Sequence, residues 1–174
     1  MVSSNGVIYK FLEGVDGQRV DFETYPTHLG KDNDVEGLCY DPKTNSLLLA
    51  LKGNPGNGLG KDKKSVYSFS LKTKQLSRNP RFVLDKKHLQ KYSKYNDFKP
   101  SGIARHPKTS NFFIIAANGN LMIEINPEGD VIEISNLDRK LHKQAEGISF
   151  YDEKILFISD EGKKNGKLTK YILE

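Results

Sequence analysis

Three stretches of this sequence resemble one another, and this internal repeat limits the fold more than any other feature. They begin at Val35, Pro100 and Ala145. Each stretch carries a glycine, a short alternating strand, a tight turn and then a nearly continuous apolar strand. Such self-similarity indicates that one supersecondary unit is repeated and stacked. The fold should therefore follow from the repeating unit.

The repeating unit has the pattern of four antiparallel strands. Gly37, Gly102 and Gly147 mark equivalent places, and 45 residues separate the last two. Alternating strands such as SVYSFSL, which starts at Ser65, follow each pair of strands that surrounds a turn. Four antiparallel strands in about 45 residues are typical of a blade of a β-propeller.

The turns inside the repeats use residues that favour tight turns. They are Asp41-Pro42, His106-Pro107 and Asp152-Glu153. An aspartate side chain can cap such a turn, and proline presets the backbone at its second position. We expect His106, in the second of these turns, to face solvent.

The first two repeats are 65 residues apart, about 20 more than one period. The excess falls at Asp85–Asp97, which is polar and rich in lysine. Leu89, Tyr92 and Tyr95 have helical spacing there. We therefore expect a short helical insertion near residues 85–97.

These patterns predict an all-β chain that forms an incomplete β-propeller of about three four-stranded antiparallel blades. Residues 1–174 would form a single partial propeller domain. Its blade units would be residues 1–34 (partial), 35–99, 100–144 and 145–174 (partial). A six-bladed ring at this period needs about 270 residues. The missing blades would belong to a longer protein, with this chain as its C-terminal portion, or to a second copy in a homodimer.

The composition restricts the function only loosely. The chain has 27 basic and 22 acidic residues, and many lysines lie in its middle third. We interpret these lysines as solvated surface and expect no nucleic-acid partner, although a patch for an anionic surface is the alternative. Cys39 is the only cysteine, so it cannot form an internal disulfide. It should be a small buried apolar side chain.

Four segments make the chain similar to the SdiA-regulated family of bacterial proteins, which are relatives of NHL-repeat and phytase-like six-bladed propellers. The segments are Val35–Leu38, Lys99–Ala104, Ala145–Ser149 and Leu156–Glu161. The resemblance runs from about Val35 to the end. It implies a protein of the cell envelope, on its periplasmic side, because family members usually carry an export or anchor segment. The first residues, MVSSNGVIYK, do not have the pattern of a signal peptide.

The repeat also predicts where a site could lie. In a propeller the first strand of each blade runs beside the central channel, so residues before it and after the second strand meet at one rim. The residues predicted at this channel mouth are Glu36, Lys52, Ser101, Asn118, Glu146, Asp160 and Glu161. His142 lies four residues before Glu146 and would reach the same mouth, where a general base is one role for it.

Oxygen ligands facing one another across a channel suit a hard cation such as Ca²⁺. We therefore name Glu36, Asn118, Glu146 and Asp160 as candidate metal ligands. The alternative is structural, with Glu36 and Glu146 capping backbone N–H groups or pairing with Lys52.

Two functions for the channel mouth remain open at this stage, besides a third interpretation in which the chain is a purely structural fragment whose exposed blade faces bind a partner. The first is a binding or scaffold propeller with a cation at its mouth and a small molecule or protein as its ligand. The second is a calcium-dependent hydrolase of phosphoester or lactone type, in which the cation polarises a substrate oxygen. No catalytic set can be assembled from spacing, since the chain lacks HExxH and GxSxG patterns. The Gly-rich loop from Gly53 to Ser65 lacks a complete phosphate-binding motif and is expected to be a mobile loop over the mouth.

Overall fold

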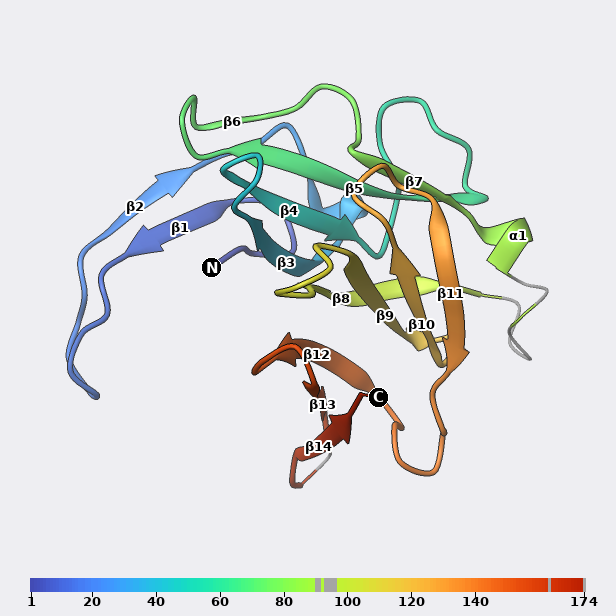
Figure 1. The fold of residues 1–174 in the computed structure, drawn as a ribbon. Helices are drawn as coiled ribbons and strands as arrows, with labels where there is room; N and C mark the ends of the chain where they lie inside the picture. Colours follow the sequence, from blue (N-terminus) through green and yellow to red (C-terminus); the bar gives the residue numbers. More distant parts are fainter. Residues whose placement is uncertain (90–91, 93–96, 163, 174) are drawn as a thin grey trace.

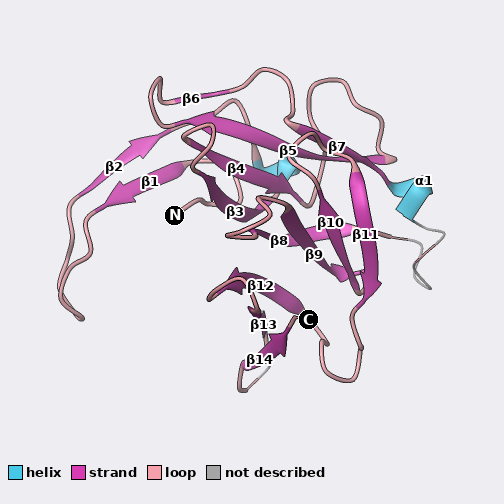
Figure 2. Ribbon diagram, viewed as in Figure 1, coloured by secondary structure: helices cyan, strands magenta, loops and turns pink. Residues whose placement is uncertain are grey.

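The protein is built almost entirely of β-strands, which form three blade-like sheets and one hairpin (Figures 1 and 2). The computed structural model describes residues 1–89, 92, 97–162 and 164–173. The hairpin pairs β1 (Ile8–Phe11) with β2 (Phe22–Tyr25). A 3-10 helix, η1 (Lys31–Asn33), leads into the first blade.

The blades are antiparallel throughout. The first contains β3 (Val35–Asp41), β4 (Ser46–Leu51), β5 (Lys63–Ser70), β6 (Gln75–Leu76) and β7 (Phe82–Asp85). The second contains β8 (Lys99–Arg105), β9 (Phe112–Asn118), β10 (Leu121–Ile125) and β11 (Val131–Asn136). The third contains β12 (Ala145–Phe150), β13 (Ile155–Asp160) and β14 (Lys167–Ile172). This arrangement confirms the incomplete β-propeller.

The first strand of each blade lies innermost, and these strands pack on one another. Strand β8 contacts β3 on one side and β12 on the other, while the remaining strands fan outward (Figure 1). The three sheets therefore form an arc around one axis. The ends of β3, β8 and β12 are the positions from which side chains can share a channel mouth.

The same irregularity occurs in all three first strands. A β-bulge shifts the register between Val35 and Gly37, between Pro100 and Gly102, and between Ala145 and Gly147. A bulge leaves one residue unpaired and re-aims its side chain. The bulged residues are Glu36, Ser101 and Glu146. The three predicted glycines are thus structurally equivalent, each following the bulge.

Two of these glycines let neighbouring blades approach closely. A Cβ atom added to Gly37 would lie 2.8 Å from Ala50 Cβ and 3.0 Å from Ile103 Cγ2 of the next blade. One added to Gly102 would lie 3.2 Å from the carbonyl oxygen of Glu146 in the third blade. Close blade contact therefore requires a residue without a side chain here.

The second strands of the first and second blades are buried on both faces, which explains their continuous apolar sequences, whereas β13 of the third blade alternates between buried and half-buried residues. In β9, Ile114 packs toward the first blade, in a cluster with Leu48 of that blade and Ile103 of β8. The adjacent Ile115 packs toward the third blade, against Leu156. The far face of the first blade is covered by the N-terminal hairpin through a separate cluster that includes Ile8, Leu49 and Tyr67.

Each inter-strand turn is capped by the side chain that was predicted to form it. Asp41 Oδ1 accepts the N–H of Lys43, and Asp152 Oδ1 accepts the N–H groups of Lys154 and Ile155. These local hydrogen bonds fix the turns because they replace solvent partners of backbone donors.

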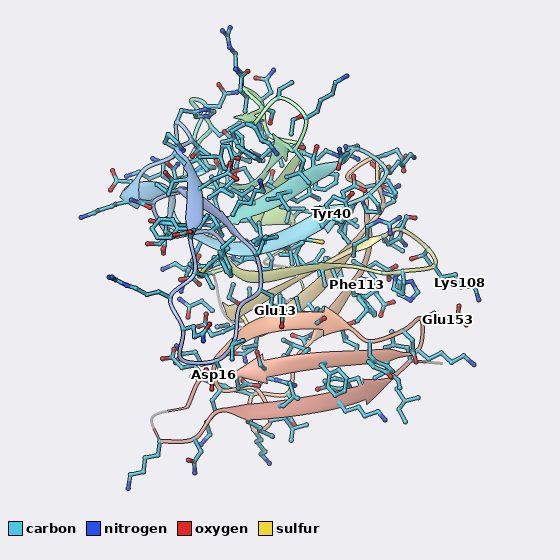
Figure 3. All side chains as sticks on the ribbon, turned by 90° about the vertical axis from the view of Figure 1, so that its left-hand side faces the viewer. Glu13, Asp16, Tyr40, Lys108, Phe113 and Glu153 are labelled. Atoms are coloured by element: carbon cyan, nitrogen blue, oxygen red, sulfur yellow. The ribbon has the colours of Figure 1, made fainter. Side chains whose placement is uncertain are left out.

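His106 caps the second turn in the same way, and its predicted exposure is wrong. Its Nδ1 accepts the N–H groups of Lys108 and Thr109, while Nε2 lies 3.0 Å from the carbonyl oxygen of Glu153 in the third blade. The ring also packs edge-on to Phe150 with centroids 4.8 Å apart. Beside it, Lys108 and Glu153 form an ion pair of 3.1 Å (Figure 3). This turn therefore joins two blades.

Two details of the first blade differ from the sequence pattern. Its fourth position is divided between β6 and β7, which pair with opposite ends of β5. Of the predicted insertion, α1 (Lys86–Leu89) is helical. Residues 90–91 and 93–96 of that prediction, Tyr95 among them, lie outside the described residues. Within the described part of the chain, no helix is long and apolar enough to cross a membrane.

The close approach at Gly37 predicts a specific cost of substitution. Gly37→Ala should lower the free energy of unfolding by about 1–3 kcal/mol, because the new methyl group forces two packed blades apart. Gly30→Ala is the matched control, since Gly30 has φ of −130° and open space around its Cβ position. Urea denaturation measures both. Equal effects of the two substitutions would contradict the tight blade contact.

Candidate functional site

Backbone hydrogen bonds bring the ends of the first and second strands to one rim. The N–H of Lys52, directly after β4, donates to the carbonyl of Asp34, directly before β3, at 2.8 Å. In the third blade the N–H of Glu161 donates to the carbonyl of Gln144 at 2.9 Å. The residues predicted at the mouth therefore lie beside one another within each blade.

Glu36 projects from the first bulge and is held by a lysine of its own blade. Lys52 Nζ lies 2.8 Å and 2.9 Å from the two carboxylate oxygens of Glu36. Both side chains are about one quarter exposed, at 26% and 24%. This ion pair is the structural alternative that the sequence left open for Glu36.

Glu146 projects from the third bulge, and negative charges outnumber positive charges among the groups that act on it. Partial burial raises the pKa of Glu146, and the charges of Glu36 and Glu161 raise it further. The hydrogen bond from Gln144 and the charge of Lys52 oppose this rise. Carboxylates of two blades therefore share one electrostatic site.

Gln144 bridges the two carboxylates of the third blade. Its Nε2 donates to Glu146 Oε1 at 3.2 Å and to Glu161 Oε2 at 2.6 Å. We call Glu36, Lys52, Glu146 and Glu161 the rim cluster. Three carboxylates and one ammonium give it a formal charge of −2 when all are ionised.

The second blade contributes no charge from its bulge. Ser101 is buried, and its hydroxyl donates to the carbonyl of Ala145 at 2.5 Å and accepts the N–H of Ala117 at 3.2 Å. This serine therefore ties the second blade to the third. Asn118 is exposed at the end of β9, opposite Lys99 in the strand pairing.

Asp160 belongs to a buried hydrogen-bonded chain beside the rim cluster. Its Oδ2 lies 2.7 Å from His142 Nδ1, and its Oδ1 accepts the N–H of Gln144. His142 is fully buried, and its Nε2 lies 2.7 Å from the hydroxyl oxygen of Tyr171. Burial, with the charges of Asp138 and Asp160, raises the pKa of Tyr171.

His142 therefore holds the third blade together. Its spacing to Glu146 predicted that it would reach the mouth, and that prediction is wrong. The sequence signal that could have revealed this contact is weak. Tyr171 stands opposite Leu156 on the inner face of the sheet, 29 residues beyond His142. Only the pairing of β13 with β14 places the two rings together.

Two further groups have pKa values set by burial. Lys64 is 4% exposed, and its Nζ donates to the carbonyls of Lys52 and Gly53. Burial lowers its pKa to about 8, with help from the charge of Lys86. Lys64 is one of the lysines in the middle third that were interpreted as solvated surface, and for this residue that prediction is wrong. Cys39, expected to be buried, is half-buried against the core between the first two blades; burial raises its pKa to about 11, so its thiol is protonated at neutral pH.

A cavity of about 760 Å³ lies next to the rim cluster in the third blade. It is formed by the loop before β12 and the loop after β13. Its lining includes Gln144, Asp160 and Glu161, together with Lys140, Lys143 and Lys167. The cavity gives the rim a space in which a ligand can be surrounded by protein on several sides.

The four predicted metal ligands do not converge on one point. Asp160 is engaged by His142, and Glu36 by Lys52. Among the described residues, no group of three or more His, Cys, Asp and Glu side chains is arranged to hold a metal ion. Glu36, Glu146 and Glu161 are the carboxylates that the structure does bring into electrostatic contact.

Comparison with known proteins gives a family and a fold. A family model described as SdiA-regulated matches residues 16–164. No curated protein matches the chain. Among solved structures, a luciferin-regenerating enzyme matches at 12% identity and a TM-score of 0.59, covering 87% of this chain and 48% of the enzyme. A nidogen/laminin complex matches at 13% and 0.58, covering 96% and 58%.

A gluconolactonase from Xanthomonas campestris matches at 13% identity and a TM-score of 0.50, covering 90% of this chain and 51% of that protein. The chain therefore spans about half the length of the solved structures that it resembles. At these identities the similarity shows the propeller fold alone.

The buried chain from Asp160 to Tyr171 predicts a stability effect at one tyrosine. Tyr171→Phe should lower the free energy of unfolding by about 1–2 kcal/mol, because the buried Nε2 of His142 loses its hydrogen-bond partner. Tyr151→Phe is the control, since Tyr151 is 78% exposed. Urea denaturation compares the two. A Tyr171→Phe protein as stable as Tyr151→Phe would argue against the hydrogen-bonded chain.

The rim cluster predicts a pH-dependent effect at Glu146. Its pKa is raised above the usual 4.5 in the folded protein, so the ionised carboxylate opposes folding at neutral pH. Glu146→Gln should therefore stabilise the protein at pH 7 by about a few tenths of a kcal/mol, because solvent screens a partly exposed group. The gain should fade as the pH falls through the raised pKa of Glu146 and should be gone below the usual glutamate value. Thermal melts from acidic to neutral pH measure this, with Glu128→Gln as the control.

A gain for Glu146→Gln that is equally large in acid would contradict this electrostatic origin.

Proposed function

The chain belongs to the SdiA-regulated family, and from that premise we propose that it is a binding or scaffold propeller with a cation site at its channel mouth. The cation would be divalent and hard, such as Ca²⁺. The resemblance to the family supports a place in the bacterial cell envelope. The rim cluster supports the cation site.

The observation that carries the proposal is the charge imbalance around Glu146. The rim cluster gathers three carboxylates and a single ammonium group. Glu146 is harder to ionise there than in water, because burial and neighbouring carboxylates disfavour its charged form. A bound divalent cation would remove that penalty, and carboxylate oxygens are the ligands that calcium prefers.

Binding would require a change at Glu36. Lys52 holds both oxygens of this carboxylate, so a cation would compete with the ammonium group for it. Ca²⁺ takes six to eight oxygens, and water or ligand oxygens in the adjacent cavity would complete the shell. Removal of the lysine charge should therefore strengthen cation binding.

A calcium-dependent hydrolase of phosphoester or lactone type remains the second candidate. In that mechanism the same cation would polarise a substrate oxygen beside the cavity. A gluconolactonase is one of the solved structures with a similar fold. Calcium-dependent turnover that disappears in Glu146→Gln would support the hydrolase, whereas calcium binding without turnover would support the binding propeller.

Calcium should raise the thermal midpoint of the protein relative to EDTA. A ligand that binds only the folded state stabilises it by about 2.7 kcal/mol at one hundred times its Kd. The rise should disappear in Glu146→Gln and should occur at lower calcium in Lys52→Met. Scanning calorimetry over a calcium series measures all three proteins.

Glu128→Gln serves as the control and should respond like the unaltered protein. Identical midpoints in EDTA and in excess calcium would overturn the cation site. A calcium response that Glu146→Gln retains would move the site away from the rim cluster.

A further inference from the structure

The third blade has one buried face and one uncovered apolar face. Leu156 and Ile158 of β13 point toward the second blade and are 1% and 0% exposed. The residues that alternate with them, such as Phe157, point the other way. On β14 the same outer face carries Leu168 and Ile172, which are 65% and 73% exposed. Exposed large apolar side chains on one sheet face, here on either side of Lys170, mark an interaction surface.

The edge of this blade is also free. Strand β14 pairs with β13 along one side only, and no described strand pairs with its other side. In the first and second blades, a further strand occupies the corresponding place. An unpaired edge strand presents backbone donors and acceptors that another strand can satisfy.

The opposite end of the arc has a matching set of free groups. The hairpin packs Ile8 on the first blade, but its far part exposes Leu12 and Phe22, which are 84% and 61% exposed. Strand β2 pairs only with β1 among the described strands. Figure 1 shows the loop between β1 and β2 projecting away from the three sheets.

The charges of the two ends are complementary. Lys167 and Lys170 lie on the exposed β14. The projecting loop carries Glu13 and Asp16, both labelled in Figure 3, and Asp21, against a single basic residue, Arg19. Opposite charges on two surfaces favour their contact and fix its orientation.

We infer that a second copy of this chain covers the outer face of the third blade, with its hairpin beside the free edge of β14. A two-fold axis would repeat the contact, because each copy has one hairpin and one uncovered blade. Two arcs of three blades would then close one ring. The mouth of that ring would receive a rim cluster from each copy, although the pairing itself does not depend on cation binding.

The mass of the protein in solution tests this pairing. Size-exclusion chromatography with light scattering should give twice the chain mass of 19.6 kDa at micromolar concentration, with or without EDTA. Leu168→Glu on β14 and Phe22→Glu on the hairpin should each shift the protein to the monomer mass. Ile132→Glu is the matched control, because Ile132 is 56% exposed on the edge strand of the second blade and should leave the dimer intact.

Circular dichroism and thermal melts would show that each variant is folded, as expected for substitutions at exposed positions. Mixed cross-linking gives a second measurement. In a Cys39→Ser background, one protein with Glu23→Cys and another with Lys170→Cys should form a disulfide-linked pair of chains when they are mixed and oxidised with diamide. A monomer mass for the unaltered chain would overturn the inference and would point to further propeller blades as the occupant. A dimer that survives both Leu168→Glu and Phe22→Glu would overturn it as well.

Discussion

The packing of each first strand against the next is the contact on which the rest of this structure depends. Gly37 of β3 and Gly102 of β8 let the strands approach to a distance that a methyl group would prevent. Each glycine directly follows a β-bulge, and the bulge turns the preceding residue out of the ladder. One local device therefore brings the blades together and presents Glu36 and Glu146 at the rim. Blade cohesion and the candidate site are consequences of the same backbone irregularity.

The features that sequence analysis predicted are those produced by local constraints. The bulge requires a glycine at a fixed place, and Asp41 caps its own turn, so both leave a repeated pattern in the sequence. The features that it missed depend on partners distant in the chain. His106 reaches a carbonyl 47 residues away, and His142 meets Tyr171 across a strand pair. Lys64 is buried because two carbonyls of another loop accept its ammonium group.

The residues at the three equivalent bulges have different roles. Ser101 in the second blade is neutral and buried, and it joins two blades through its hydroxyl group. Glu36 and Glu146 are partly exposed and charged, and the charge of Glu36 disfavours ionisation of Glu146. Ser101 lies between them in the middle blade. A group whose ionised form is disfavoured in the folded state lowers stability, and such costs are concentrated at functional sites. The rim cluster fits that pattern.

Direct measurement of the coupling between blades is the strongest test of this account. Carboxyl-carbon NMR can titrate Glu146 in the unaltered protein and in Glu36→Gln. Neutralising Glu36 removes a negative neighbour and frees Lys52, so the pKa of Glu146 should fall. An unchanged titration of Glu146 would show that the two bulged residues do not share a mouth, and the arrangement of the blades around one axis would then be contradicted.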